Sequence, residues 1–195
     1  MTSIAIALFD GVEELDVAGP WEVLSWWARE WPEDEVEVFT VADSTDAITC
    51  AKGMRMLPDR TWQDAGSIDV LVYPGGRGTR PQLGDERIRE RIRELAARGT
   101  LMTSVCTGAL VYADAGLLDG RPATTHWSSL DLLRTLGTDI DVLEHARFVD
   151  DGDIVTAAGV SAGIDMALHL VRRLRSEERA RDVRRGIQYD PEPPV

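Results

Sequence analysis

Short apolar runs alternate with amphipathic helical patterns along the whole sequence of 195 residues. Continuous Val, Ile and Leu runs are typical of strands buried on both faces, and their alternation with helices favours a mainly parallel sheet. We therefore expect an α/β fold. The predicted strands cover residues 4–9, 37–42, 68–73, 101–105, 123–125, 147–149 and 154–157. The predicted helices cover residues 20–29, 85–98, 108–115, 128–136 and 161–175.

No linker-like segment interrupts this pattern, so we expect one domain over residues 1–195. The last stretch, residues 185–195, contains an acidic run rich in proline, which predicts an extended tail.

The composition limits the possible partners. The net charge of −13, from 21 basic and 34 acidic residues, opposes contact with phosphate backbones, so no nucleic-acid partner is expected. No apolar run approaches the ~18 residues of a membrane span, and no signal peptide is recognisable. The two cysteines, Cys50 and Cys106, are too few for a secreted disulfide framework and favour a reducing cytoplasm. Lys52 is the only lysine, which argues against Schiff-base chemistry.

Three loops follow the ends of predicted strands, at residues 10–16, 74–76 and 106–108. Ligand sites of parallel sheets lie beyond the carboxyl ends of the strands, near a topological switch point. We therefore expect these three loops to meet and to form the functional site.

Cys106 is the strongest candidate for a nucleophile. It lies between a predicted strand and a predicted helix, and such a strand-to-helix elbow projects one side chain out of the backbone. The amides that open the next helix, including that of Thr107, carry partial positive charge and are expected to stabilise a thiolate. The alternative is a free cysteine that only fills the core.

Acidic residues and paired glycines lie in the neighbouring loops. Asp16 has apolar neighbours, so among Glu13, Glu14 and Asp16 it is the one expected to point inward and to exchange a proton with a thiol. The alternative is a charge that faces the dipole of a helix. The amides of Gly75 and Gly76 either approach a ligand, as in an oxyanion hole, or form a turn that needs positive φ.

His126 follows a predicted strand and either orients the thiol or packs beside Trp127. The other histidines have no partner at a useful spacing. No cluster has the spacing of a zinc site, and no nucleotide-binding motif occurs, so we expect neither a metal nor a nucleotide cofactor.

Four tryptophans, Trp21, Trp26, Trp27 and Trp31, lie in or just after the first predicted helix. Neighbouring helical residues diverge by about 100°, so one face cannot bury all of them. The surplus suggests a subunit interface or a pocket wall, or else a half-exposed tryptophan beside the core. Cys50, in a predicted hairpin, is interpreted as structural.

Together these segments resemble the ThiJ/PfpI superfamily, and the resemblance covers essentially the whole chain. Within the superfamily the chain is most similar to the isocyanide hydratase branch, because of Asp16, of Thr107 after the cysteine, and of the ending Gln188-Tyr189-Asp190-Pro191. The runs that carry the resemblance are Phe9-Asp10-Gly11, Glu14-Leu15-Asp16-Val17-Ala18-Gly19-Pro20, Tyr73-Pro74-Gly75-Gly76, Val105-Cys106-Thr107-Gly108, Ala115-Gly116-Leu117-Leu118-Asp119-Gly120, Ala123-Thr124-Thr125-His126-Trp127 and Gly159-Val160-Ser161-Ala162-Gly163-Ile164-Asp165.

The resemblance implies a flavodoxin-like three-layer α/β/α sandwich, a homodimer, a small-molecule substrate and no cofactor. It implies that Cys106 is the nucleophile, that Asp16 is its hydrogen-bonded acid, and that the amides of Gly75 and Thr107 bind developing negative charge. The implied enzyme is a carbon–nitrogen lyase that hydrates an isocyanide to an N-formamide through a thioimidate on Cys106. His126 is a possible supporting residue.

Other branches of the superfamily define the alternatives. Peptidases of the group place His directly after the cysteine, where this chain has Thr107, and the glyoxalase and deglycase branch usually has Glu at the position of Asp16. A glyoxalase-, deglycase- or amidase-type hydrolase is one alternative. The other is a cysteine-based sensor of a ligand or an oxidant, related to the sensor domains of AraC-type regulators. Those regulators continue into a DNA-binding domain, for which this sequence is expected to have no room.

Overall fold

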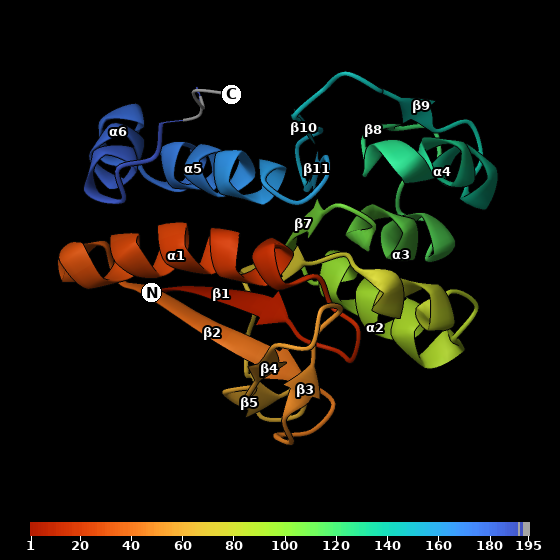
Figure 1. Ribbon diagram of the computed structural model, residues 1–195, viewed down its shortest axis with the longest axis horizontal. Coiled ribbons are helices and arrows are strands. Elements are labelled where there is room, and N and C mark those ends of the chain that lie inside the picture. The colour runs from red at the N-terminus through yellow and green to blue at the C-terminus, as the bar shows by residue number, and fades with distance from the viewer. Residues whose placement is uncertain (191, 193–195) are drawn as a thin grey trace.

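The central sheet of the computed structural model orders its seven strands as β10-β11-β7-β6-β1-β2-β5 (Figure 1). The structure describes residues 1–190 and 192. All neighbouring strands in this sheet are parallel except the pair β10–β11, so the expected mainly parallel α/β fold is confirmed. The strands are β1 (Thr2–Ala7), β2 (Val36–Ala42), β5 (Arg60–Thr61), β6 (Val70–Tyr73), β7 (Leu101–Val105), β10 (Phe148–Asp150) and β11 (Ile154–Ala157).

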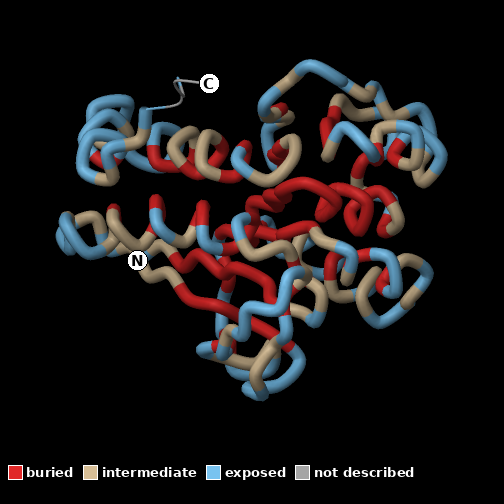
Figure 2. The backbone as a smooth tube through the Cα atoms, in the orientation of Figure 1, coloured by how far each residue is buried: buried red, intermediate tan, exposed pale blue. Residues whose placement is uncertain are grey.

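Helices cover both faces of the sheet. Ile4 and Ile6 of β1 belong to one apolar cluster, whereas Ala5 and Ala7 belong to the other, because side chains of a strand alternate between its two faces. Figure 2 shows the central strands buried between helices whose outer surfaces are exposed. The first cluster packs against α1 (Glu14–Glu30), α5 (Ala162–Leu174) and α6 (Glu177–Gly186), and the second against α2 (Glu86–Ala97), α3 (Gly108–Asp114) and α4 (Leu130–Leu136).

The remaining elements are short. They are the 3-10 turns η1 (Pro32–Asp34), η2 (Arg77–Gln82) and η3 (Trp127–Ser129), the hairpin of β3 (Ile48–Thr49) and β4 (Arg55–Met56), and the pair β8 (Pro122–Ala123) and β9 (Asp141–Val142). None of the helices in the described part of the chain has the length and apolar character that a membrane span requires.

The helix predicted to open at Pro20 begins six residues earlier, at Glu14, so that Pro20 lies inside α1. Proline there removes one hydrogen bond of the helix, and the packing against α5 compensates for it. An ideal Cβ on Gly19 would lie 3.0 Å from Cγ1 of Ile164, and one on Gly163 would lie 3.2 Å from Cγ of Pro20. The two helices therefore pack closely at these residues, and Figure 1 shows them side by side.

Two other local predictions need correction. Residues 123–125 were expected as a strand, but β8 ends at Ala123 and pairs with β9 outside the main sheet. The helix expected to be capped by Ser128 starts as η3, and the side chain of His126 accepts the hydrogen bond from the Ser128 N–H. An imidazole nitrogen thus takes the capping position that the sequence pattern assigns to a hydroxyl.

Helix α6 was not predicted, and it contradicts the first part of the expected tail, because Arg185 and Gly186 are helical. The helix buries only Val183, so its sequence lacks the apolar stripe that identifies an amphipathic helix. Within the rest of the expected tail, residues 191 and 193–195 lie outside the described residues.

Three of the four tryptophans in or just after α1 pack against η1 or α6. Trp27 is buried and its Nε1 donates to Asp34 Oδ2 at 2.6 Å. The guanidinium of Arg179 lies 4.3 Å from the centre of the Trp31 ring. An ideal Cβ on Gly186 would lie 2.4 Å from Nε1 of Trp26. The surplus aromatic surface therefore packs largely within the chain.

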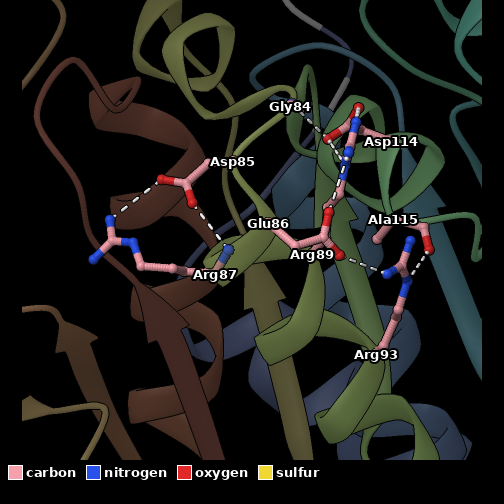
Figure 3. A network of polar contacts seen from close by, with 8 residues as sticks. All are labelled: Gly84, Asp85, Glu86, Arg87, Arg89, Arg93, Asp114 and Ala115. Carbon is pink, nitrogen blue, oxygen red and sulfur yellow. Dashed lines mark hydrogen bonds and ion pairs between the residues drawn. The ribbon is translucent and has the colours of Figure 1, made fainter.

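A network of arginines and acids fastens the C-terminal end of α3 to α2 (Figure 3). Arg89 donates to both oxygens of Asp114, at 2.8 Å from Nε and 2.7 Å from Nη2. The N–H of Gly84 donates to the same carboxylate at 2.9 Å, and Nε of Arg93 donates to the carbonyl of Ala115 at 2.9 Å. Such paired bonds fix orientation as well as distance, so the helix that follows β7 is held in place at its far end.

The near end of α3 depends on Gly108. An ideal Cβ at this position would lie 2.1 Å from the carbonyl oxygen of Tyr73 and 3.0 Å from that of Pro74, which are backbone atoms that cannot rotate away. We expect Gly108→Ala to lower the free energy of unfolding by about 1–3 kcal/mol, the usual cost of overpacking. Urea denaturation measures it, with Glu22→Ala on the exposed face of α1 as the control. Equal stability of the two variants would contradict the close contact.

Candidate active site

The three loops that follow β1, β6 and β7 meet at the carboxyl ends of these strands, as the sequence predicts. The N–H of Glu13 donates to the carbonyl of Gly75 at 2.9 Å, and the N–H of Gly76 donates to Oγ1 of Thr107 at 3.0 Å. The chain leaves β1 for β2 on one side and later returns to β6 on the other. The meeting point is therefore a topological switch point of the sheet.

Cys106 occupies a strained turn between β7 and α3. Its φ of 56° lies in the left-handed region, which costs a residue other than glycine about 1–2 kcal/mol. Hydrogen bonds hold it there. Its N–H donates to the carbonyls of Ala157 and Ala158 at 3.1 and 3.0 Å, and the hydroxyl of Thr125 donates to its carbonyl at 2.6 Å. The expected elbow is present, and only 5% of the residue is exposed.

Gly75 lies against this elbow and leaves no room for a side chain. An ideal Cβ would lie 2.4 Å from the Thr107 nitrogen and 2.8 Å from Cβ of Cys106. The Gly75 N–H donates to Oδ2 of Asp16 at 2.8 Å. This amide was expected to bind charge that develops on a substrate, but in the resting protein it already holds a carboxylate. The Thr107 amide faces the sulfur of Cys106.

Asp16 is completely buried, which agrees with the inward orientation expected from its neighbours. Burial raises the pKa of its carboxyl to about 7, against the hydrogen bond from Gly75, and the charge of Glu13 raises it further. Its Oδ2 accepts from Gly75, and Oδ1 has no hydrogen-bond partner among the described residues. The Cys106 thiol lies within hydrogen-bonding reach of the carboxyl. Asp16 is thus a carboxyl group that keeps or releases its proton close to neutral pH.

The sequence pattern predicts an acidic thiol at Cys106, whereas its surroundings in the folded chain shift the pKa in the opposite direction. Burial and the adjacent Asp16 carboxylate raise the pKa of Cys106 to about 12, and they outweigh the hydrogen bonds from the amides of Thr107 and Val160. Burial disfavours both ionised groups, and the two charges would also repel each other. The pair therefore loses its first proton near neutral pH and holds the second one much more tightly, and the thiolate forms where Asp16 carries that remaining proton.

Val160 is a site residue that the sequence analysis missed. Its amide hydrogen-bonds to Cys106, and its φ of 48° is unusual for a β-branched residue. The run Gly159-Val160-Ser161, two residues after the end of β11, was the available signal, because small residues flank the turn. An apolar side chain gives no hint that the backbone of the residue is the functional part.

His126 lies beside the site but not against the sulfur. Its Nδ1 is 2.8 Å from Oγ of Ser128, and no hydrogen bond joins it to Cys106 in the described part of the chain. Its ring packs on Gly159, where an ideal Cβ would lie 2.3 Å from Cδ2. The contact places His126 against the turn that contains Val160. The adjacent Trp127 ring is 77% exposed.

Glu13 and Glu14 pair with Lys52. Cys50 is fully buried as a free thiol next to the same loop. Over residues 1–190 and 192, no group of three or more His, Cys, Asp or Glu side chains is arranged to hold a metal ion.

The raised pKa of Asp16 predicts a stability effect of definite sign. The unfolded carboxyl releases its proton near pH 3.8 and the folded one near pH 7, so between these values folding binds a proton and stability falls as the pH rises. We expect Asp16→Asn to gain stability relative to the wild type by about 1.4 kcal/mol per pH unit over this range. Denaturation at pH 4.5 and pH 7.5 tests it, with the exposed Asp131→Asn as control. A difference that does not change with pH would contradict the burial of a charged Asp16.

Comparison with known proteins agrees with this geometry. The family model described as "DJ-1/PfpI family" matches residues 2–173. An isonitrile hydratase from Pseudomonas putida is 40% identical over 191 residues, which are 98% of this chain and 80% of that protein. The regulator CdhR of Pseudomonas aeruginosa is 36% identical over 68% of this chain and 39% of its own length.

Solved structures show the same fold. A ThiJ/PfpI family protein from Pseudomonas syringae superposes with a TM-score of 0.89 at 33% identity, covering all of this chain and 77% of that one. The resemblance seen in the sequence is therefore confirmed, and the protein belongs to the DJ-1/PfpI family.

Proposed function

We propose that this protein hydrates a small isocyanide to an N-substituted formamide, with Cys106 as the nucleophile and Asp16 as the group that moves protons. The observation that carries the proposal is the fully buried carboxyl of Asp16 beside Cys106, which occupies a strained turn between β7 and α3. The 40% identity to an isonitrile hydratase over almost the whole chain supports the substrate class.

The first step uses the tautomer in which Asp16 is neutral and Cys106 is a thiolate. The sulfur adds to the terminal carbon of the isocyanide, and the electron pair that forms on this carbon takes the proton of Asp16. The product is a thioimidate, R–N=CH–S–Cys106, and Asp16 is left as a carboxylate. A buried acid with a pKa of about 7 suits this task, because proton transfer is efficient when the pKa lies near the working pH.

The second step adds water to the thioimidate. Asp16 accepts a proton from water as the oxygen bonds to the carbon, and it delivers that proton to the nitrogen. Asp16 then accepts the hydroxyl proton while the carbonyl forms and the carbon–sulfur bond breaks. The formamide R–NH–CHO leaves, and the thiolate and the neutral Asp16 are restored. The amides of Thr107 and Val160 stabilise charge on the sulfur at both ends of the cycle.

The narrow access to Cys106 also favours this substrate class. The residue is 5% exposed, and an isocyano group is linear, with its reactive carbon at the tip. The site is also separate from the surface depression of about 330 Å³ between α5 and α6, which is lined by Phe148, His169 and Tyr189 among others and does not include Cys106. A slender terminal group is what such a site admits.

We expect Cys106→Ala to abolish formamide formation from a simple aryl isocyanide, with a loss of kcat/KM of at least about 10³-fold, because the variant lacks the thiol that hydrogen-bonds to Asp16. The absorbance of the formamide measures turnover, and Cys50→Ala is the matched control that should remain active. Turnover that survives in Cys106→Ala would contradict the mechanism. Lactate formed from methylglyoxal in place of formamide would instead assign the protein to the glyoxalase-type alternative.

We expect kcat/KM of the wild type to rise as the pH passes through about 7, where the pair loses the first of its two protons, and then to stay level to the alkaline limit of the assay. Asp16→Asn should lose both the activity and this rise, since an amide supplies no proton. Initial rates from pH 5 to pH 9 provide the measurement. A flat profile in the wild type would show that the pair does not control the reaction.

A further inference from the structure

The hairpin of β3 and β4 folds back onto the loop that carries Asp16. The N–H of Gly11 donates to the carbonyl of Thr49 at 2.8 Å, and the N–H of Ala51 donates to the carbonyl of Val12 at 2.8 Å. The N–H of Thr49 donates to Oδ1 of Asp10, also at 2.8 Å. The hairpin therefore forms hydrogen bonds with residues 10–12 of the loop between β1 and α1.

The tip of this hairpin presents Lys52, the only lysine of the chain. Its ammonium forms an ion pair with Glu13, and it lies 3.8 Å from Oε2 of Glu14. Its backbone N–H donates to Oε1 of Glu14 at 2.7 Å. Oε2 of Glu14 is buried and has no hydrogen-bond partner in the described part of the chain, so the ammonium is the positive charge that faces it. One residue thus binds both glutamates.

A short chain of contacts connects this pair of glutamates to the reacting groups. The N–H of Glu13 donates to the carbonyl of Gly75, and the N–H of Gly75 donates to Asp16. Glu14 lies two residues before Asp16, in the first turn of α1. A movement of the two glutamates, or a change in their charge, is therefore transmitted to Asp16 through these contacts.

We propose that Lys52 is a positioning residue for the Asp16 carboxyl: it clamps the loop through its backbone and offsets the charges of Glu13 and Glu14 with its ammonium. The inference rests on the proposed function, because it assigns the residue that sets the working range of the same pair. A lysine that pairs only with exposed acids would have no such consequence.

Charged side chains of both signs near Asp16 act on the pKa of its carboxyl. The acidic side chains of the same segment are Glu13 and Glu14, with Asp10 earlier in the loop, and the charge of Glu13 acts on the carboxyl of Asp16. The Cys106 thiol hydrogen-bonds to that carboxyl, and the positive charge that acts on it is Lys52 of the hairpin. Glu13 raises the pKa of Asp16 and Lys52 lowers it, so the two side chains act with opposite sign.

The experiment measures the rate at which iodoacetamide alkylates Cys106 as a function of pH, with mass spectrometry of the peptide that contains it. The thiolate is the form that reacts, so the alkylation rate reports how the protonation of the Asp16–Cys106 pair changes with pH, without any substrate turnover. We expect Lys52→Gln to move the midpoint of the profile upward by about 0.5 pH unit and Glu13→Gln to move it downward by a similar amount. Lys52→Arg should leave the midpoint within ~0.2 unit of the wild type, and the Lys52→Gln shift should shrink in ~1 M salt.

Arg98→Gln is the matched control, because it removes one positive charge from an exposed ion pair with Glu94 of α2. A uniform loss of rate at every pH, with no movement of the midpoint, would assign Lys52 a merely structural role and overturn the proposal. So would equal shifts in Arg98→Gln and Lys52→Gln. If the shifts occur in a protein that does not hydrate isocyanides, the inference stands and the proposed function fails.

Discussion

The structure depends on the burial of a carboxyl group against a thiol. Asp16 and Cys106 are both buried, so the ionisation of both groups at neutral pH is strongly unfavourable and the pair retains at least one proton. Each of the surrounding features serves this arrangement. Gly75 lacks a side chain so that the loop after β6 can touch the elbow, and its amide fixes one oxygen of Asp16.

This arrangement contains local features that lower the stability of the fold, and contacts with neighbouring elements offset them. A charged aspartate without full hydrogen bonding, a cysteine with φ of 56° and a valine with φ of 48° are each unfavourable alone. They persist because neighbouring elements determine their positions. Hydrogen bonds from the Cys106 N–H to β11 and its flank, the Thr125 hydroxyl, and the clamp between α2 and α3 leave the elbow no alternative conformation. The stable parts of the sheet thus support a site that would not be stable by itself.

Much of this could be predicted from the sequence, for identifiable reasons. Strands buried on both faces are continuous apolar runs, so β7 and β11 were located at their observed bounds, and the strand ends then indicated where Cys106 and Asp16 meet. The sequence predictions that failed concern features that depend on contacts between distant segments. Pro20 lies inside α1 where that helix packs against α5, α6 packs against η1 and the tryptophans with few apolar residues, and the amide of Val160 hydrogen-bonds to Cys106. The direction of the Cys106 pKa shift failed because burial outweighs the amides at the start of α3, and burial is a property of the folded chain.

The single lysine has a consequence for anyone who handles this protein. Apart from the chain's first amino group, reagents that couple to primary amines find one target, and it is Lys52, with 68% of its side chain exposed at the hairpin tip. The arginines that dominate the rest of the basic surface do not react in the same way. Amine-directed labelling, cross-linking or attachment to a support would thus divide between the first amino group and the hairpin that contacts the loop carrying Asp16.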